Sequence, residues 1–445
     1  MRHNTYKSLA ALLLAALMLT STGCTQESAV QTEPTEITEP TIAETTLPET
    51  EPTTAPPEPQ EFLLTFIGDC TLGTCPGLES STASFPRIVG TDYDYPFRNV
   101  VQYFEDDDFT MANLEGVLGD KGTRVHKQFN FRGSAEYVNI LTGSSVEAVT
   151  LSNNHTEDYG PEGYEETKRI LTEAELPFVE TDSSTMITTE SGLVIGLYAA
   201  KFTIDQADLE AEVAALREQG AQLVIFAVHW GNEGHYRPMP YQVQQAYDAI
   251  DAGVDIVYGT HPHVLQKIEE YNGGVIFYSL GNFCFGGNHY PADLNTAIVR
   301  QKVIRETDGT VRLLERELIP CAVTSFRVQN NFQPTPYEVG SYGYNCAMNK
   351  LHGTWTGGNL LVDYSPKPEP TDPPATEAPT VPPATEAPAV PPATEAPAVP
   401  PATEAPVAPP ATEAPAVPPA TEAPAVPPAT EAPAPDPAPD IGSEA

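Results

Sequence analysis

Five short apolar runs, each followed closely by residues able to bind a metal ion, constrain the fold of this chain most strongly. Runs of this length, rich in β-branched and aromatic residues, predict buried strands. In open α/β folds, residues just past the strand ends meet at one edge of the sheet. The pattern therefore predicts an α/β domain with one polynuclear metal centre built from distant segments. The runs span 62–67, 109–112, 148–151, 223–228 and 255–258, and the predicted metal ligands are Asp69, Glu115, Asn154, His229, His261 and His263.

Residues 1–24 have the anatomy of a secretory signal. Arg2 and Lys7 precede an apolar stretch over 9–19, which is too short to span a bilayer comfortably. Cys24 follows a run of small residues, an arrangement that resembles the bacterial lipobox, in which the cysteine becomes the lipidated first residue. Because Ser21 stands where that pattern has an aliphatic residue, plain secretion is the alternative. We expect a lipid-anchored protein on the extracellular face of the bacterial cell membrane.

Two segments rich in Thr, Glu and Pro flank the central part of the chain. Residues 25–60 contain no basic residue and almost nothing to bury, which predicts a disordered linker. Residues 365–445 repeat a nine-residue unit, PPATEAPAV with small variations, whose adjacent prolines exclude a solenoid core. Both segments are predicted to be semi-rigid spacers in polyproline II conformation. The remaining residues, 61–364, are long enough for one large α/β domain.

The net charge of the chain limits its binding partners. The formal net charge is −39, and its acid excess is not confined to the flanking segments. Nucleic acid is therefore not an expected partner, because binding a phosphate backbone needs a basic stripe.

Among the five cysteines after Cys24, the simplest disulfides would join Cys70 to Cys75 or Cys321 to Cys346. Because five is an odd number, at least one cysteine is left free or pairs elsewhere.

The order of the predicted elements changes late in the domain. Up to residue 258, strands alternate with helices predicted at 161–173, 205–219 and 241–252, as in βαβ units. Strands predicted at 275–278, 297–305 and 311–318, with a turn at Asp308-Gly309, indicate antiparallel pairing. We expect a mixed sheet or two packed sheets flanked by helices.

The residue types at the strand ends suit a dinuclear hydrolytic centre. Such a centre needs carboxylate, imidazole and often amide ligands, one bridging group and an open face for water. Glu115 is long enough to bridge, and His155 beside the ligands is a natural general acid or oxyanion stabiliser. Taken separately, Gly68-Asp69 is also typical of a turn, Asn154 of a helix cap and His229 of a core position.

Six strings in order along the chain carry a resemblance to a known family: FIGDCTLG, ANLEGVLGD, LSNNHTEDYG, VHWGNEGHYRP, GTHPHVLQKIE and YSLGNFCFG. They resemble the motifs of the CapA family of bacterial capsule and poly-γ-glutamate synthesis proteins, which is similar in fold to the calcineurin-like metallophosphoesterases. The resemblance covers residues 61–285. It implies a four-layer α/β/β/α fold in which two packed mixed β-sheets are flanked by helices.

The resemblance also implies roles for the strand-end residues around two divalent ions of Mn, Fe or Zn. His155 would be the catalytic histidine, and Glu115 would stand where phosphoesterases have a bridging aspartate. Phosphoesterases carry Asp-x-His where this chain has Asp69-Cys70-Thr71, so the first metal loses an imidazole. Whether Cys70 replaces this imidazole as a ligand is left open, and a disulfide to Cys75 would prevent it. The first metal would be bound by Asp69 and His263, and the second by Asn154, His229 and His261.

Four further residues are predicted to contact the substrate. Asn282, in the last string, would orient it, although an asparagine that forms a turn is the alternative. Lys127, Arg132 and Glu233 are predicted substrate contacts, with solvated surface charges as the alternative for each.

Two functions follow from this pattern. The first is a cell-surface metal-dependent hydrolase of a phosphoester, or of an amide in an anionic polymer such as poly-γ-glutamate, in which activated water attacks and His155 assists the leaving group. The second is a non-catalytic, membrane-anchored component that binds polymer, or partner membrane proteins, in a capsule or poly-γ-glutamate synthesis complex.

Overall fold

The structure is a computed structural model of the protein, and it describes residues 58–326 and 329–361. Cys24, the predicted signal, most of the predicted linker and the repeat tail lie outside the described residues. The predictions made for these segments stay predictions. Among the helices within the described ranges, none is both long and apolar enough to cross a bilayer.

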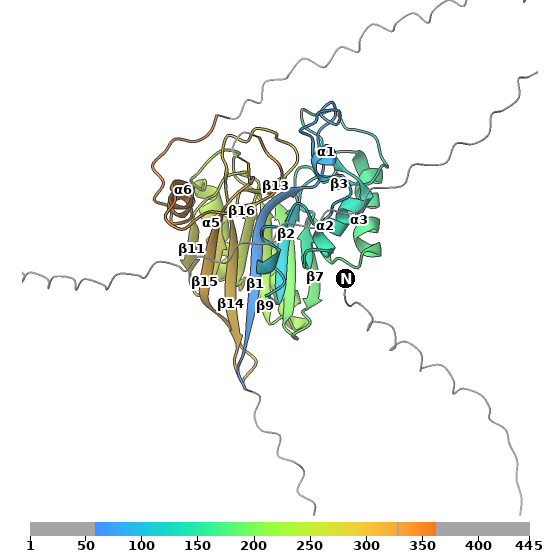
Figure 1. Cartoon of the computed structure of the whole chain (residues 1–445). Coiled ribbons are helices and arrows are strands. Elements are labelled where there is room, and N and C mark those ends of the chain that lie inside the picture. The colour runs from blue at the N-terminus through green and yellow to red at the C-terminus, as the bar shows by residue number, and fades with distance from the viewer. Residues whose placement is uncertain (1–57, 327–328, 362–445) are drawn as a thin grey trace, which may run out of the picture. The chain divides into compact units, whose positions relative to one another are not determined.

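Two β-sheets lie face to face at the centre of the domain (Figure 1). The larger has the order β16 (Thr335–Pro336), β15 (Val311–Ala322), β14 (Asn295–Arg305), β1 (Gln60–Thr71), β2 (Phe109–Leu114), β5 (Ala148–Thr150) and β6 (Phe178–Val179), and β13 (Asn282–Phe285) also pairs with β1. The smaller has the order β11 (Ile268–Tyr271), β12 (Gly274–Phe277), β10 (Ile256–Thr260), β9 (Leu223–His229), β8 (Val194–Lys201) and β7 (Ser183–Thr188). A two-stranded sheet joins β3 (Val117–Leu118) to β4 (Arg132–Gly133).

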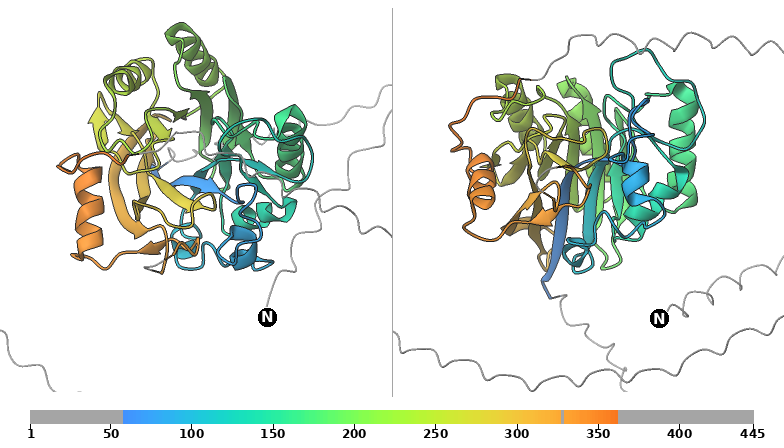
Figure 2. Two further views of the ribbon diagram at one scale, coloured as in Figure 1. Left: turned by 90° about the horizontal axis from the view of Figure 1, so that it is seen from above. Right: turned by 45° about the horizontal axis from the view of Figure 1, so that its top comes forward.

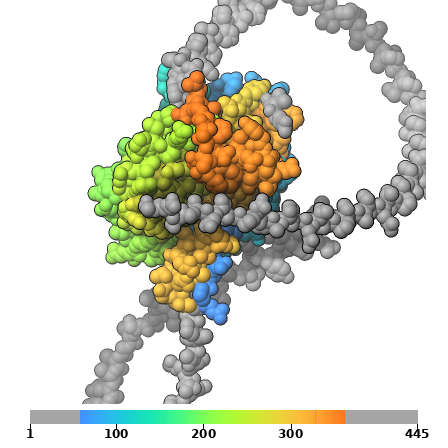
Figure 3. Space-filling view, turned by 90° about the vertical axis from the view of Figure 1, so that its left-hand side faces the viewer, coloured from blue at the N-terminus to red at the C-terminus, as the bar shows by residue number. Residues whose placement is uncertain are grey.

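Helices cover the outer faces of both sheets, as Figure 2 shows from two sides. The outer face of the larger sheet carries α1 (Phe85–Val89), α2 (Val138–Thr142) and α3 (Gly160–Glu173), and that of the smaller sheet carries α4 (Gln206–Glu218) and α5 (Pro240–Asp251). The last helix, α6 (Tyr342–Leu351), packs on β14 and β15, within the orange segment of Figure 3. Short 3₁₀ turns occupy Val101–Tyr103 and Ala135–Tyr137. The four-layer α/β/β/α prediction is confirmed.

Side-chain alternation along the strands generates these layers. In β9, Ile225 and Ala227 join the apolar cluster between the two sheets, whereas Val224 and Phe226 join the cluster beneath α4 and α5. A strand buried on both faces reads as a continuous apolar run, because successive side chains point to opposite faces. This explains why the run at 223–228 is apolar without interruption.

The predicted elements agree closely with those in the structure. The three long helices lie within one residue of α3, α4 and α5 at each end. The late strands are β12, β14 and β15, and β14 and β15 pair antiparallel around the predicted turn. Gly309 adopts a φ of 86° there, which suits glycine. The sequence interpretation missed β7, β11, β13 and α6, and also the short elements α1, α2, β3, β4, β6 and β16.

The suggested disulfides are wrong, because all five cysteines of the described residues are free. Cys70 is buried in the cluster between the larger sheet and its helices, whereas Cys75 packs in a separate cluster with Phe131 and Phe285. Cys321 is buried in β15, and Cys346 lies partly exposed on α6. Cys70 and Cys75 therefore lie in different clusters, and no disulfide joins Cys321 to Cys346.

One hydrogen bond joins the two sheets just below the edge that carries the strand-end ligands. The buried Tyr258 of β10 donates its hydroxyl to the carbonyl of Ile67 in β1 at 2.6 Å. The pairing of β1 with β2 shifts register between Phe66 and Asp69, next to that carbonyl. Tyr258 therefore satisfies a buried acceptor at an irregular point of the ladder.

We expect Tyr258→Phe to lower the free energy of unfolding by about 1 to 3 kcal/mol, because the Ile67 carbonyl would be left buried without a partner. Urea denaturation checks this value. Tyr290→Phe, at an exposed position, is the matched control and should change stability by less than about 0.5 kcal/mol. Equal stability of the two variants would contradict the inter-sheet role of Tyr258.

Candidate metal centre

The structure brings the six predicted ligands to one edge of the two sheets. Within the larger sheet, β1 and β2 are parallel and place Asp69 beside Asn113, two residues before Glu115. Within the smaller sheet, β9 and β10 are parallel and place His229 beside Thr260. Parallel strands present their carboxyl ends at the same edge, which is why residues distant in sequence converge here.

A first group of ligands consists of Asp69, Glu115 and His263. Their ligand atoms lie within 4.8 Å of one another, and both carboxylates are fully buried. His263 Nδ1 lies 3.2 Å from Asp69 Oδ2, and its Nε2 lies 3.7 Å from Glu115 Oε1. Neither of those carboxylate oxygens has a hydrogen-bond partner among the described residues. Buried oxygens left in this way fit a bound cation.

A second group consists of Asn154, His229 and His261. Asn154 Oδ1 lies 2.9 Å from Nε2 of His229, whose Nδ1 is held by Thr260 Oγ1 at 2.9 Å. The rings of His229 and His261 are 4.5 Å apart, and Nδ1 of His261 has no partner within the described part of the chain. Burial lowers the pKa of His229 well below its usual value and that of His261 to about 3. Both imidazoles are therefore neutral, as metal binding requires.

The loop that carries two of the histidines has a strained backbone. His261 adopts a φ of 97° and His263 a φ of 57°, a region that residues other than glycine seldom enter. The carbonyl of Pro262 between them accepts a hydrogen bond from the Gly234 amide at 2.9 Å. Backbone strain that the surrounding structure holds in place is typical of functional sites.

His155 is the centre of a hydrogen-bonded group beside the ligands. Its Nδ1 is 2.7 Å from Asp158 Oδ2, and its Nε2 lies 3.7 Å from Glu115 Oε1. Burial lowers the pKa of His155, although Asp158 opposes this. The imidazole is therefore neutral, with its N–H towards Asp158 and a free Nε2 facing the ligands. The sequence interpretation missed Asp158, although it lies three residues after His155 in the same string.

Lys127 lies behind His155 and forms an ion pair with the buried Asp158. Its ammonium group also donates to the Asn154 carbonyl at 2.9 Å. These contacts fix the loop that presents Asn154 and His155. The structure thus places Lys127 against the site, with its charge directed to a carboxylate of the protein rather than to open space.

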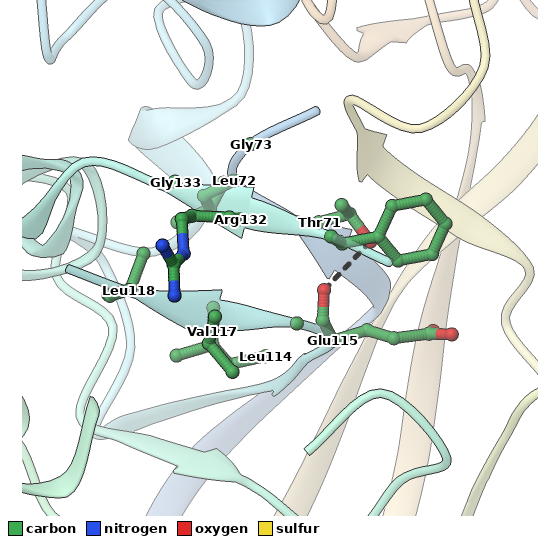
Figure 4. A pocket seen from close by; sticks show the side chains of 11 residues that line it. Thr71, Leu72, Gly73, Leu114, Glu115, Val117, Leu118, Arg132 and Gly133 are labelled. Carbon is green, nitrogen blue, oxygen red and sulfur yellow. Dashed lines mark hydrogen bonds between the residues drawn. The ribbon is translucent and has the colours of Figure 1, made fainter. Parts of the chain in front are cut away.

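Arg132 lies away from the ligands. Figure 4 shows its side chain pointing away from the carboxylate of Glu115. The guanidinium stacks over the Tyr159 ring at 3.4 Å and donates to the carbonyl of Lys121. An aromatic ring and a backbone carbonyl thus hold this cation, and its predicted contact with substrate stays a prediction.

Two other predicted substrate contacts lie close to the histidines. Asn282 Oδ1 is 2.8 Å from Nδ1 of His263, so this amide orients a ligand. Glu233 has a carboxylate oxygen within 4.8 Å of ligand nitrogens of His261 and His263. Glu233 is therefore in range to bind a metal ion, a role that the sequence interpretation did not consider.

Asn113 and Asn153 form an amide network beneath the carboxylates, and the sequence interpretation missed both. Asn113 Nδ2 donates to Asp69 Oδ1 at 2.9 Å, and its Oδ1 accepts from Asn153 Nδ2 at 3.1 Å. Asn153 also accepts from the His155 amide at 3.0 Å. The sequence features that pointed to these two residues were the string ANLEG, which contains Asn113, and the adjacent pair Asn153-Asn154.

The first motif contributes no further ligand. Thr71, which stands in place of a histidine, donates its hydroxyl to the Glu115 carbonyl at 2.9 Å (Figure 4). Cys70 points into the apolar cluster with its sulfur 3.6 Å from the Gly68 carbonyl, and burial raises its pKa well above the usual value. Cys70 is therefore a buried thiol, and His263 is the single imidazole of the first group.

Comparison with known proteins agrees with this architecture. The model of the family described as "Bacterial capsule synthesis protein PGA_cap" matches residues 63–287, a range that contains all six ligands. The capsule biosynthesis protein CapA of Bacillus anthracis is 30% identical over 257 residues, which are 51% of this chain and 61% of that protein. The PGA biosynthesis protein CapA of Bacillus subtilis (strain 168) is 33% identical over 216 residues, 43% of this chain and 57% of that protein. The chain thus spans less than two thirds of the length of these two relatives.

More distant relatives and solved structures also match. A probable polyglutamine synthesis accessory protein of Mycobacterium tuberculosis (strain ATCC 25618 / H37Rv) is 25% identical over 282 residues, 54% of this chain and 73% of that protein. The NAD nucleotidase NadN of Haemophilus influenzae is 12% identical with a TM-score of 0.32, covering 66% of this chain and 63% of that one. A likeness at that TM-score has no bearing on function.

His263→Ala is expected to reduce the number of divalent ions bound per chain, because the first group would keep only its two carboxylates. Mass-spectrometric metal analysis after loading with Mn²⁺ or Zn²⁺ measures this. His352→Ala, at an exposed position, is the control and should bind the same number of ions as the wild type. An unchanged metal content in His263→Ala would contradict the assignment.

Metal affinity is expected to rise with pH. Burial acts to lower the pKa of His263, but Glu115 and Asp69 outweigh it and raise that pKa to about 10. The imidazole is protonated at neutral pH and must release its proton to bind a cation. One proton released corresponds to about tenfold in affinity per pH unit below that pKa. Calorimetric titration with Mn²⁺ between pH 6 and 8 checks the slope, and a flat profile would contradict it.

Proposed function

Because this chain belongs to the family of bacterial capsule synthesis proteins PGA_cap, we propose that it is a metal-dependent hydrolase of an acidic capsule polymer. The observation that carries the proposal is the pair of buried oxygens of Asp69 and Glu115 that have no hydrogen-bond partner among the described residues and that face His263 and Nε2 of His155. The proposed substrate is an amide bond in a poly-γ-glutamate type of chain. The relative of Bacillus subtilis named for PGA biosynthesis supports that choice.

In the proposed mechanism, one set of residues binds metal ions and another transfers a proton. Divalent ions, when bound by the six strand-end ligands, supply a Lewis acid and an activated water molecule. The neutral His155 accepts a proton at Nε2 from the attacking water while Asp158 stabilises the resulting imidazolium. As the carbon–nitrogen bond breaks, His155 gives this proton to the leaving amine, which restores the starting state.

The proposal includes a location. The lipid anchor predicted at Cys24 holds the protein on the extracellular face of the cell membrane, and the flanking spacers carry the domain away from the bilayer. In that position the domain meets nascent polymer and the membrane proteins of a capsule synthesis complex. Detergent extraction and acyl labelling of the wild type and Cys24→Ala test the anchor.

A second candidate function is a polymer-binding component without catalysis. Two observations favour it: Thr71 stands where phosphoesterases have an imidazole, and the mycobacterial relative is named an accessory protein. In this case the same residues hold an ion that binds polymer carboxylates. Turnover is the property that separates the two functions.

Turnover is measured on the full chain after metal removal and reloading with Mn²⁺, Fe²⁺ or Zn²⁺. The substrates are γ-linked glutamate oligomers and a chromogenic phosphoester. The hydrolase predicts metal-dependent cleavage of the oligomers that His155→Ala abolishes and His352→Ala leaves intact. Metal uptake without cleavage of either substrate would favour the binding component, and absence of metal uptake would sink the hydrolase.

Asp158→Asn is expected to lower kcat by about 10²-fold or more, because the imidazolium of His155 loses its counter-charge. Asp158 raises the pKa of His155, so its removal should also move the acid limb of the pH–rate profile to lower pH. A purely structural defect would not cause that shift. Asp120→Asn, an exposed carboxylate, is the control. A wild-type profile in Asp158→Asn would contradict the positioning role.

A further inference from the structure

A cavity of about 260 Å³ lies outside the metal centre, between the loop before α5 and the segment that follows α6. We call it the Arg237 cavity. Its lining side chains include Tyr236, Arg237, Val243, Lys267 and Trp355. The two charged residues among those that line it are both basic, and no carboxylate of the described residues lines it. In a chain with a formal net charge of −39, this local excess of positive charge indicates an anionic ligand.

The two cations differ in how far the protein neutralises them. Arg237 is exposed, donates to the Trp355 carbonyl at 3.4 Å, and pairs with no carboxylate within the described ranges. Lys267 lies 2.8 Å from Glu269, but that carboxylate also accepts hydrogen bonds from Tyr247 at 3.1 Å and Tyr278 at 2.9 Å. The tyrosine hydroxyls carry no charge, so Glu269 still offsets the charge of Lys267, and the positive charge that remains at the cavity lies on the guanidinium of Arg237.

The aromatic walls of the cavity are held in place by their neighbours. The rings of Tyr236 and Trp355 are 5.7 Å apart, and the buried ammonium of Lys350 lies 4.5 Å and 5.1 Å from their centroids. Lys350 is itself held by Asp293 at 2.7 Å. The indole Nε1 of Trp355 is buried with no hydrogen-bond partner in the described structure. This N–H lies against Gly357, which does not line the cavity, so the indole serves as a wall of the cavity and not as a donor to its ligand.

The loop that lines the Arg237 cavity also reaches the metal centre. Glu233, in range of the metal-binding histidines, precedes Arg237 by four residues, a separation of at most about 14 Å between Cα atoms. Two hydrogen bonds tie the loop to the histidine segment, from the Gly234 amide to the Pro262 carbonyl at 2.9 Å and from Gln266 to the His235 carbonyl at 2.7 Å. A long ligand would reach both places, and their relative position is fixed.

We propose that the Arg237 cavity binds a carboxylate of an acidic polymer and positions the chain for the metal centre. The carboxylate takes the Arg237 guanidinium as its main partner, with the Lys267 ammonium as a second donor. A planar guanidinium suits a carboxylate because it offers two parallel hydrogen bonds. The identity of the polymer rests on the proposed function, whereas the chemistry of the cavity does not.

The test is calorimetric binding of a γ-linked glutamate pentamer to the full chain after metal removal, so that the metal centre does not contribute. We expect Arg237→Gln to weaken binding by about tenfold, the typical effect of losing a charge-assisted hydrogen bond. Arg312→Gln, which removes the same charge from an exposed site, is the control and should bind within about twofold of the wild type.

The outcomes separate this proposal from the hydrolase. Equal binding by Arg237→Gln and the wild type, or an equal loss in Arg312→Gln, would overturn the Arg237 cavity as the binding site. Inorganic phosphate and glutarate, a dicarboxylate, are compared as competitors of the pentamer. Stronger competition by phosphate would overturn a carboxylate as the ligand of the Arg237 cavity. Because binding is measured without metal, absence of turnover in the reloaded wild type would count against the hydrolase alone.

Discussion

The burial of two carboxylates, Asp69 and Glu115, is the condition on which the rest of the site depends. An ionised carboxylate removed from water is costly unless a cation or hydrogen-bond donors compensate it. Asn113 donates to Asp69, and the imidazolium of His263 lies within 4 Å of both carboxylates. One oxygen of each carboxylate still lacks a hydrogen-bond partner in the described structure. A divalent cation bound there would take the place of the His263 proton and would compensate both carboxylates directly.

The fold supplies the rigidity that this arrangement needs. The parallel ends of β1 and β2 bring the carboxylates together, while β9 and β10 bring the imidazoles from the other sheet. Tyr258 joins the sheets directly beneath, and the Gly234 amide fixes the strained histidine loop. Because the same loop continues to Arg237, the Arg237 cavity and the candidate metal centre belong to one structural unit.

Much of the fold and the positions of the ligands were predictable because both depend on local sequence. Apolar runs define strands buried on both faces, and α/β topology places whatever follows them at one edge. Side-chain direction was not predictable: Arg132 binds a backbone carbonyl and a tyrosine ring, and Cys70 faces the core rather than the ligands. Asp158 and Glu233 were missed as partners of histidines because their contacts depend on loop conformation.

The central claim is that the strand-end residues hold divalent ions between the two sheets. Anomalous diffraction from crystals of the protein grown with Mn²⁺ tests it most directly. The account predicts a peak in contact with Asp69, Glu115 and His263 and a second in contact with Asn154, His229 and His261. An anomalous map without a peak at either group, from protein that remains folded, would contradict the account.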